Sequence, residues 1–182
     1  MNIHSEQKEQ KRKKLSGFSV VEILVSVCII ALLASTALVS YQRYLVQAEI
    51  SYALGSSHTV KHLLLEYYYT IGKWPKDNKQ LQDYVENTPG QMWQDWLKDS
   101  PIQQIAVNSS GVINAWFGRS SKMSQYVDNP ILTLRPVITD GDGLGTIFWL
   151  CGNALPPDHA VVLGENRTNI PDELLITNCK RN

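Results

Sequence analysis

The residues best suited to metal chemistry fall into two short groups. His58, His62 and Glu66 are spaced by four residues, so a helix would place all three on one face, as a metal site requires. The sequence indicates no fourth ligand, and a solvated helix face is the simpler interpretation. Residues 140–143, Asp-Gly-Asp-Gly, match the start of a calcium loop, but the fifth position is Leu144, which has no side-chain oxygen. We therefore expect a turn there, with neither a metal nor a cofactor.

Patterns typical of catalysis are not evident. The chain has no Ser-His-Asp order, Cys-His pair, phosphate-binding loop or zinc motif, so an enzyme is not expected. Trp93, Trp96 and Trp116 could stack on single-stranded DNA, but cations do not cluster around them. We interpret these tryptophans as core or subunit-packing residues.

Glu22 is a carboxylate beside a long uncharged segment. The 20 residues from Ile23 to Gln42 carry no charge, and as a helix they would be ~30 Å long, about the thickness of a bilayer core. A carboxylate costs about 2.5–3.5 kcal/mol at mid-bilayer and usually has a partner. If the chain were cut after Gly17, Phe18 would carry a new α-amino group one helical turn from Glu22. Glu22 could then neutralise the amine of a neighbouring chain when apolar helices bundle.

Charge is distributed unevenly along the 182 residues, although the net charge is zero. The first 17 residues hold five cations and two anions, and the remaining 165 hold 12 cations and 15 anions. Cations before an uncharged segment place the N-terminus in the cytoplasm. Three interpretations compete: a secretory signal cut near residues 35–37, a permanent signal anchor, or a leader removed before the apolar segment. Glu22 favours the third, because a secretory signal has no use for such a carboxylate.

The segment KKLSGFSVVEILVSVCIIALLASTALVSYQRY resembles the N-terminus of type IV prepilins, in the type IVa-like G-F-x-x-x-E class. The resemblance implies that Gly17 is the last leader residue, recognised by prepilin peptidase. It implies that Phe18 is the first mature residue and is N-methylated, and that Glu22 is needed for methylation and subunit recruitment. Tyr41 and Tyr44 match aromatic positions that are common in the family.

Two positions depart from that family's usual pattern. The chain has Val39 where a proline is usual and Ala31 where a glycine is frequent. The proline and the glycine that this chain lacks both weaken helices. Any local melting of this helix would therefore need another cause.

The helical pattern continues beyond the uncharged segment. Between residues 42 and 70 apolar side chains recur at spacings of three and four, which predicts an amphipathic helix, and Gly72 and Pro75 end it. One helix from Phe18 to Thr70 would be ~80 Å long, so we expect it to protrude from the domain. Its end also resembles pilins, in which paired tyrosines precede a Gly-x-x-Pro turn.

The rest of the chain predicts an α+β domain. We expect a short helix near Gln80–Val85 and four strands at residues 102–107, 111–118, 130–139 and 145–151, joined partly by turns at 108–111 and 140–143. The strands would form a four-stranded antiparallel sheet packed against the distal half of the long helix.

The C-terminal part of the chain also resembles pilins. Phe148–Cys151 matches the last strand and residues 170–180 match the closing segment, which implies a disulfide between Cys151 and Cys179. In an oxidising periplasm such a bridge would stabilise the fold by about 3.5 kcal/mol. Cys28, within the apolar segment, is expected to be a buried free thiol.

The resemblance implies a structural subunit of a type IV pilus, serving adhesion, twitching motility or DNA uptake. Residues 1–17 would be the leader peptide, 18–42 the transmembrane and assembly half of the helix, and 43–182 the periplasmic or extracellular head. The subunit would cross the inner membrane once, with its C-terminus in the periplasm. Prepilin peptidase/methyltransferase and the pilus assembly machinery would then deliver it into a helical homo-oligomeric filament with other pilins.

Two alternatives stay open on the sequence. One is a type II secretion pseudopilin, which shares the N-terminal motif, although the cysteine pair favours a pilin. The other is a minor pilin that binds DNA through Arg167, Lys180 and Arg181.

Overall fold

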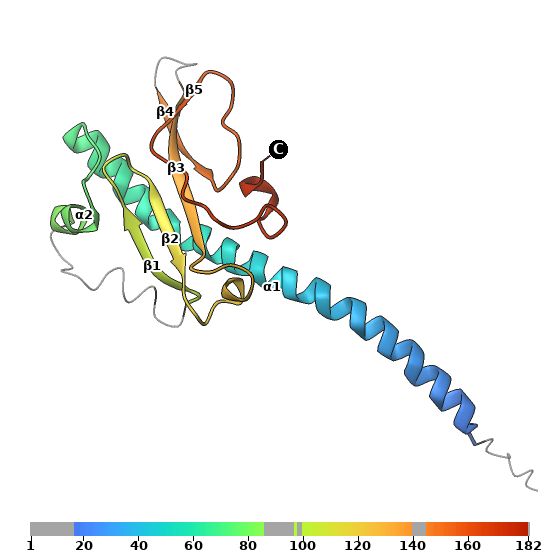
Figure 1. The fold of residues 1–182 in the computed structure, drawn as a ribbon. Coiled ribbons are helices and arrows are strands. Elements are labelled where there is room, and N and C mark those ends of the chain that lie inside the picture. Colours follow the sequence, from blue (N-terminus) through green and yellow to red (C-terminus); the bar gives the residue numbers. More distant parts are fainter. Residues whose placement is uncertain (1–16, 86–96, 98–99, 140–144, 182) are drawn as a thin grey trace, which may run out of the picture. The chain divides into compact units, whose positions relative to one another are not determined.

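The computed structural model describes residues 17–85, 97, 100–139 and 145–181. The chain forms two compact units, residues 1–39 and 40–182. The predicted leader, except Gly17, and the predicted turn at 140–143 lie outside the described residues. The elements are helices α1 (Val20–Ile71) and α2 (Asn78–Tyr84), strands β1 (Ile102–Val107), β2 (Ile113–Phe117), β3 (Ile131–Thr139), β4 (Thr146–Cys151) and β5 (Ala160–Val162), and 3-10 helices η1 (Lys122–Gln125) and η2 (Thr177–Cys179) (Figure 1).

In the second unit, α1 buries one narrow stripe of side chains, as its spacing predicts. The stripe advances by alternate steps of four and three residues, and its members are Val46, Ile50, Ala53, Ser57, Val60, Leu64 and Tyr67. Ser57 is the one polar member, and its hydroxyl donates to the carbonyl of Ala53 at 2.6 Å. That bond satisfies the buried hydroxyl, so the stripe behaves as a continuous apolar surface.

The end of α1 follows the predicted stop signals. Gly72 has a φ of +78°, a conformation that favours glycine, and its N–H donates to the carbonyl of Tyr68 at 2.8 Å. The chain then turns so that Trp74 stacks on Tyr68, with ring centroids 4.5 Å apart. Asp77 caps α2 by accepting a hydrogen bond from the backbone N–H of Gln80.

The sheet is antiparallel in the order β1-β2-β3-β4, and it has five strands where the sequence predicted four. The missed strand, β5, pairs with Val137–Thr139 of β3. Since β4 occupies the other edge of those residues, β5 continues the edge that β2 leaves at Leu134. Three residues are too few to show a strand's alternation, so the sequence had no signal for β5.

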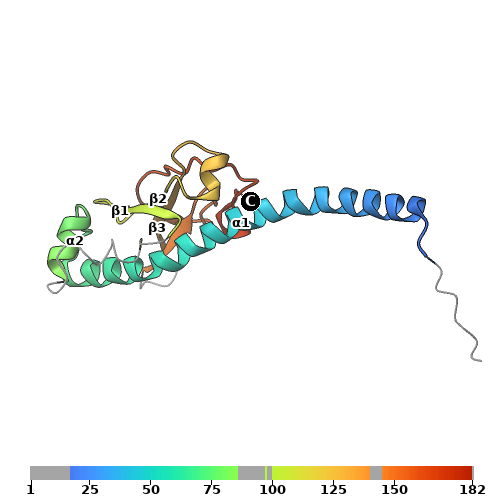
Figure 2. The same ribbon diagram turned by 90° about the horizontal axis from the view of Figure 1, so that it is seen from below.

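One face of the sheet packs on the buried stripe of α1 within residues 40–182 (Figure 2). Residues of β2 and β3 that join the helix in this core include Ile113, Ala115, Leu132 and Leu134. Asn78 of α2 holds the outer edge of β1: its side-chain amide donates to the carbonyl of Ile105, and its oxygen accepts from the N–H of Val107, both at 2.7 Å. The amide thereby covers backbone groups that an edge strand would leave unpaired.

The connection between β2 and β3 is fastened to α1 by side chains. The Glu49 carboxylate accepts hydrogen bonds from the Ser121 hydroxyl, from the backbone N–H of Lys122 at 2.8 Å and from that of Met123 at 3.2 Å. About two helical turns nearer the N-terminus, the Tyr126 hydroxyl donates to Oε1 of Gln42 at 3.3 Å. These contacts hold the connection beside the first turns of α1 in this unit.

Two glycines give opposite predictions. Gly111→Ala should destabilise the head by about 2 kcal/mol or more, because Gly111 has a φ of +72° and a Cβ would lie 2.6 Å from the Trp74 ring. Gly55→Ala should stabilise it by about 0.5–1 kcal/mol, because Gly55 is inside α1 and a Cβ there meets nothing within 4 Å.

Denaturant unfolding of the full chain in detergent, followed by near-ultraviolet circular dichroism, measures both changes. Equal effects of the two substitutions would contradict this account of the turn and of the helix.

Candidate functional site

The first half of α1 has no polar face. Between Val20 and Leu38 its large aliphatic side chains, at the positions 20, 21, 23, 24, 25, 27, 29, 30, 32, 33 and 38, are 52–73% exposed. They surround the helix on all sides, unlike the single stripe of residues 46–67. A helix that is apolar all round requires lipid or other apolar helices as its surroundings.

Hydroxyl groups in this half are satisfied by the helix itself. Ser26 donates to the carbonyl of Glu22 at 2.8 Å, and Ser35 donates to that of Leu32, also at 2.8 Å. The segment can therefore leave water without stranding these groups. By length and composition, α1 is the one helix in the described part of the chain that could cross a membrane.

The three predicted processing residues lie together where this helix begins. Gly17 and Phe18 precede α1, and the Phe18 side chain is 75% exposed. Glu22 lies in the first helical turn, where its negative charge is favourable beside unpaired backbone N–H groups. Its carboxylate is exposed.

The backbone of α1 is helical without interruption through Ala31 and Val39. The departures from the family pattern at these two positions thus coincide with an intact backbone.

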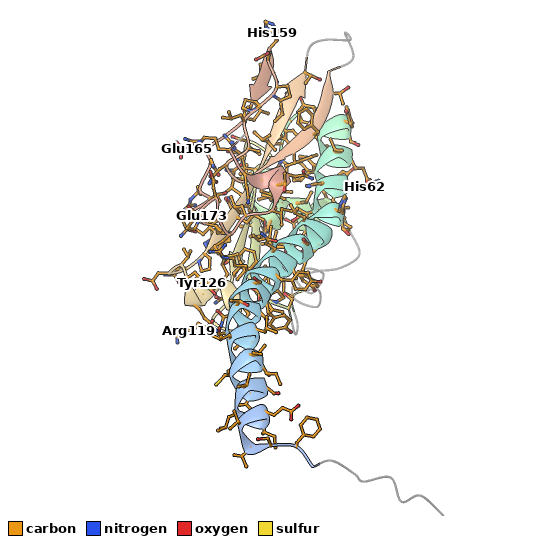
Figure 3. All side chains as sticks on the ribbon, turned by 90° about the vertical axis from the view of Figure 1, so that its right-hand side faces the viewer. His62, Arg119, Tyr126, His159, Glu165 and Glu173 are labelled. Carbon is orange, nitrogen blue, oxygen red and sulfur yellow. A yellow bond between two sulfur atoms is a disulfide. The ribbon has the colours of Figure 1, made fainter. Side chains whose placement is uncertain are left out.

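The residues weighed for metal binding do not assemble into a site in the described part of the chain. No three His, Cys, Asp or Glu side chains gather there. His58 and His62 are exposed on α1 (Figure 3), and Glu66 lies 3.5 Å from the Tyr84 hydroxyl. Trp93 and Trp96 fall outside the described residues, and Trp116 is partly buried on β2.

Two cations of the head are partly buried. Desolvation lowers the pKa of the Lys61 ammonium and also that of the Arg135 guanidinium. The Nε of Arg135 is the one buried side-chain nitrogen or oxygen in the described residues without a hydrogen-bond partner. The Arg135 side chain is partly exposed, so its charge still reaches solvent.

The C-terminal loop is closed by the disulfide that the resemblance implied. Cys151 at the end of β4 is bonded to Cys179 in η2, 28 positions later. Both cysteines belong to the same buried cluster as the α1 stripe. Beside the bridge, the N–H of Asn153 donates to the carbonyl of Cys179 at 2.9 Å. Cys28 is unpaired, as predicted, but it is exposed where the sequence predicted burial.

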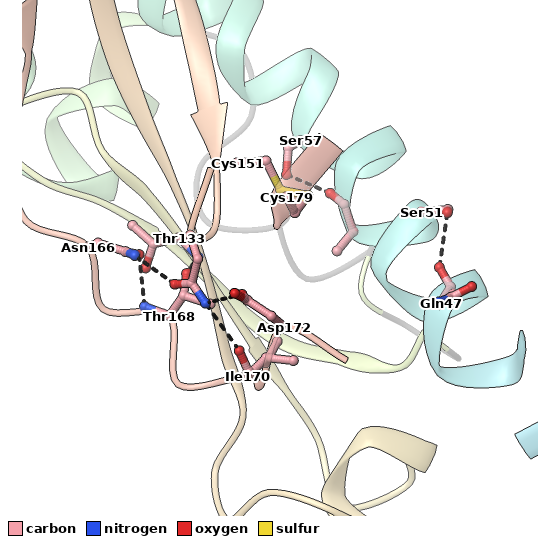
Figure 4. The surroundings of a disulfide bond; sticks show 12 residues. Gln47, Ser51, Ser57, Thr133, Cys151, Asn166, Thr168, Ile170, Asp172 and Cys179 are labelled. Carbon is pink, nitrogen blue, oxygen red and sulfur yellow. Dashed lines mark hydrogen bonds between the residues drawn. A yellow bond between two sulfur atoms is a disulfide. The ribbon is translucent and has the colours of Figure 1, made fainter. Parts of the chain in front are cut away.

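A polar network fastens this loop to the outer face of the sheet (Figure 4). Nδ2 of Asn153 donates to Asp172 at 2.8 Å, and Nδ2 of Asn166 donates to Oδ1 of Asn153 at 3.0 Å. The buried Thr133 of β3 donates its N–H to the Thr168 hydroxyl at 3.0 Å. The sequence analysis missed this network, because its members are separated by 13 to 35 positions and show no periodicity.

The disulfide should dominate the stability of the loop. Replacing Cys151 and Cys179 together by serine should lower the free energy of unfolding by about 3–4 kcal/mol, because the unfolded chain gains the entropy that the bridge removes. Guanidinium unfolding of the full chain, with and without reductant, measures the change.

Cys28→Ser is the matched control and should leave stability unchanged, since Cys28 is exposed and unbonded. Equal unfolding midpoints for the double variant and the parent would refute the role of the bridge.

Comparison with known proteins places the chain among pilins. No family model matches it. A type IV major pilin protein, PilE1, of Neisseria gonorrhoeae is 27% identical over 172 residues, 90% of this chain and 86% of the relative. A fimbrial protein of Neisseria meningitidis serogroup B is 26% identical over 84% of this chain and 81% of the relative. A probable minor fimbrial protein of Dichelobacter nodosus is 43% identical over 42 residues, 23% of this chain and 26% of the relative. With the long apolar helix, the antiparallel sheet and the C-terminal disulfide, which match the type IV pilin fold, these relatives support a type IV pilin.

Proposed function

We propose that the chain is a structural subunit of a type IV pilus, anchored in the inner membrane as a precursor and polymerised through the first half of α1. The observation that carries the proposal is the change of character along one unbroken helix. Its first half is apolar on every side, and its second half buries only the stripe that faces the sheet. Major pilins and fimbrial proteins among the relatives support the same role.

Polymerisation would exchange one apolar environment for another. In the membrane, lipid covers the side chains between Val20 and Leu38; in the fibre, the corresponding helices of neighbouring subunits cover them. Packing between helices then supplies the attraction, because lipid tails and aliphatic side chains are about equally apolar. The selectivity of this step would come from charge.

Glu22 is the group that would supply this selectivity. Cleavage after Gly17 would give Phe18 an α-amino group, and Glu22 of a neighbouring subunit would pair with that amine. An unpaired carboxylate in the bundle is costly, so a subunit would be accepted only in the register that pairs it. The exposure of Glu22 in the first turn of α1 supports this role.

Processing and orientation belong to the same proposal. The basic leader would hold the N-terminus in the cytoplasm and the head in the periplasm. Prepilin peptidase/methyltransferase would remove residues 1–17 and methylate Phe18, and the assembly machinery would then extract the subunit into an extracellular fibre. The mature chain would carry 12 cations and 15 anions.

The head would work by packing and surface contacts, and not by catalysis. The relatives are structural proteins, which supports a role without enzymatic chemistry. Their names favour a pilus subunit over a secretion pseudopilin. The disulfide loop would face outward, where it can contact other subunits or surfaces.

The start of the mature protein is the first test. Mass spectrometry of the N-terminal peptide from membranes should find N-methylated Phe18, because cleavage after Gly17 removes the leader and leaves the apolar segment in the product. A start at Met1 would mean an uncleaved signal anchor. A start near Leu38 would instead mean a cleaved secretory signal.

The second test removes the pairing carboxylate. Glu22→Ala should leave membrane insertion intact but reduce surface fibres about tenfold or more, because each new subunit would then bury an unpaired amine. Fibres are counted by electron microscopy, and insertion is measured by carbonate extraction.

Ser26→Ala is the control for that variant. It lies one turn away and removes only a hydrogen bond within the helix, so fibre numbers should stay at the parental level. Normal fibres from Glu22→Ala would refute the pairing mechanism.

A further inference from the structure

We propose that the end of the head at which α1 enters it binds the headgroups of anionic phospholipids. The site consists of three tyrosines and three cations, all exposed, which we call the collar: Tyr41, Arg43 and Tyr44 of α1, and Arg119, Lys122 and Tyr126 of the β2–β3 connection. The inference rests on the proposed membrane-anchored precursor, and it adds a lipid partner for the head.

The position of the collar along α1 follows from one hydrogen bond. Gln42 is the last residue of the uncharged segment, and Arg43 is the first charge after it. Because the Tyr126 hydroxyl donates to Gln42, the β2–β3 connection lies at the level where α1 leaves the hydrocarbon. Tyrosines are enriched at this level in membrane proteins, since their rings are apolar and their hydroxyls are polar. Tyr41, Tyr44 and Tyr126 would form such a belt.

The cations lie within reach of the same interface. The N–H of Lys122 is bonded to Glu49, seven residues after Gln42, which is ~10 Å along the helix. The headgroup layer of one leaflet is about 5–8 Å thick, and a lysine or arginine side chain can extend to it from slightly above. Arg43 lies directly at the boundary.

The charge of the collar suits anionic lipid. Few carboxylates compete for its three cations. Glu49 of α1 already accepts three hydrogen bonds, and Asp128 is the one acidic residue of the β2–β3 connection. Figure 3 shows Arg119 and Tyr126 at the entry end of the head, with Glu173 and then Glu165 farther along towards His159. Each cation near an anionic membrane surface strengthens binding about fivefold.

A hollow beside Arg119 could receive a phosphate headgroup. Its volume is about 440 Å³, and its described lining includes Ser100, Gln103, Gly118, Arg119 and Ser120, with Leu97 and Ile102 as apolar members. Hydroxyl, amide and guanidinium groups are the donors that a phosphodiester requires. Arg119 both lines this hollow and belongs to the collar, so the two sites share a guanidinium group.

Lipid fits the collar better than a second subunit does. Every precursor that is anchored through residues 23–42 must present Arg43 and Tyr126 to the membrane surface, whereas contact with another subunit requires assembly. Headgroup binding would hold the head against the bilayer in one orientation, and it would oppose extraction until α1 leaves the membrane.

The test measures amide hydrogen exchange of the full chain in nanodiscs of phosphatidylcholine, with and without phosphatidylglycerol. Exchange in residues 118–127 should slow when phosphatidylglycerol is present, and Arg119→Gln with Lys122→Gln should abolish the slowing. Removing two cations should weaken headgroup binding about 25-fold. The fold should survive, because the backbone of Lys122, and not its side chain, contacts Glu49.

Lys76→Gln with Lys79→Gln is the matched control, since it removes two exposed cations near α2 and should retain the slowing. Slowing by inorganic phosphate alone would mean a free-anion site, and slowing seen only in assembled fibres would mean a subunit contact; either result overturns the proposal. If the chain inserts but phosphatidylglycerol does not slow exchange, lipid binding by the collar is refuted and the proposed anchor is not. A chain that fails to insert refutes the proposed anchor.

Discussion

The structure depends on one helix whose two halves have different surfaces. The backbone is helical without interruption from Val20 to Ile71, its first half is apolar on every side, and its second half packs on the sheet. The uncharged segment of this helix ends at Gln42, and Arg43 is the first charge after it. The β2–β3 connection lies beside this part of the helix, because it is hydrogen-bonded to Gln42 and Glu49.

The head is attached to this helix by shape and by a few directional bonds. The stripe from Val46 to Tyr67 supplies the apolar contact, and the sheet covers it on one side. Glu49 and Asn78 then fix the parts that apolar packing would leave free to slide, namely the β2–β3 connection and the edge of β1. On β4, at the opposite edge of the sheet from β1, the disulfide and the Asn153 network hold the C-terminal loop.

Prediction from sequence succeeded where the signal was periodic or local. The helix, its end at Gly72, the short helix α2 and four of the five strands were all indicated by spacing and by turn residues. It failed for β5, whose three residues show no period, and for Glu49, whose partners lie 72 to 74 positions away. The roles of Gly17, Phe18 and Glu22 came from a short motif, and they stay predictions because they concern an enzyme and neighbouring chains.

The sequence by itself determined the length of the apolar segment and the stripe that the head would cover. These properties depend only on the residue types and their spacing along a helix. Only the tertiary structure decided which side chains join distant segments: the fifth strand beside β3, the carboxylate of Glu49 in the β2–β3 connection, and Tyr126 at the level of Gln42. The reason is physical. A hydrogen bond between distant residues depends on where packing brings the chain, and packing is a property of the whole fold.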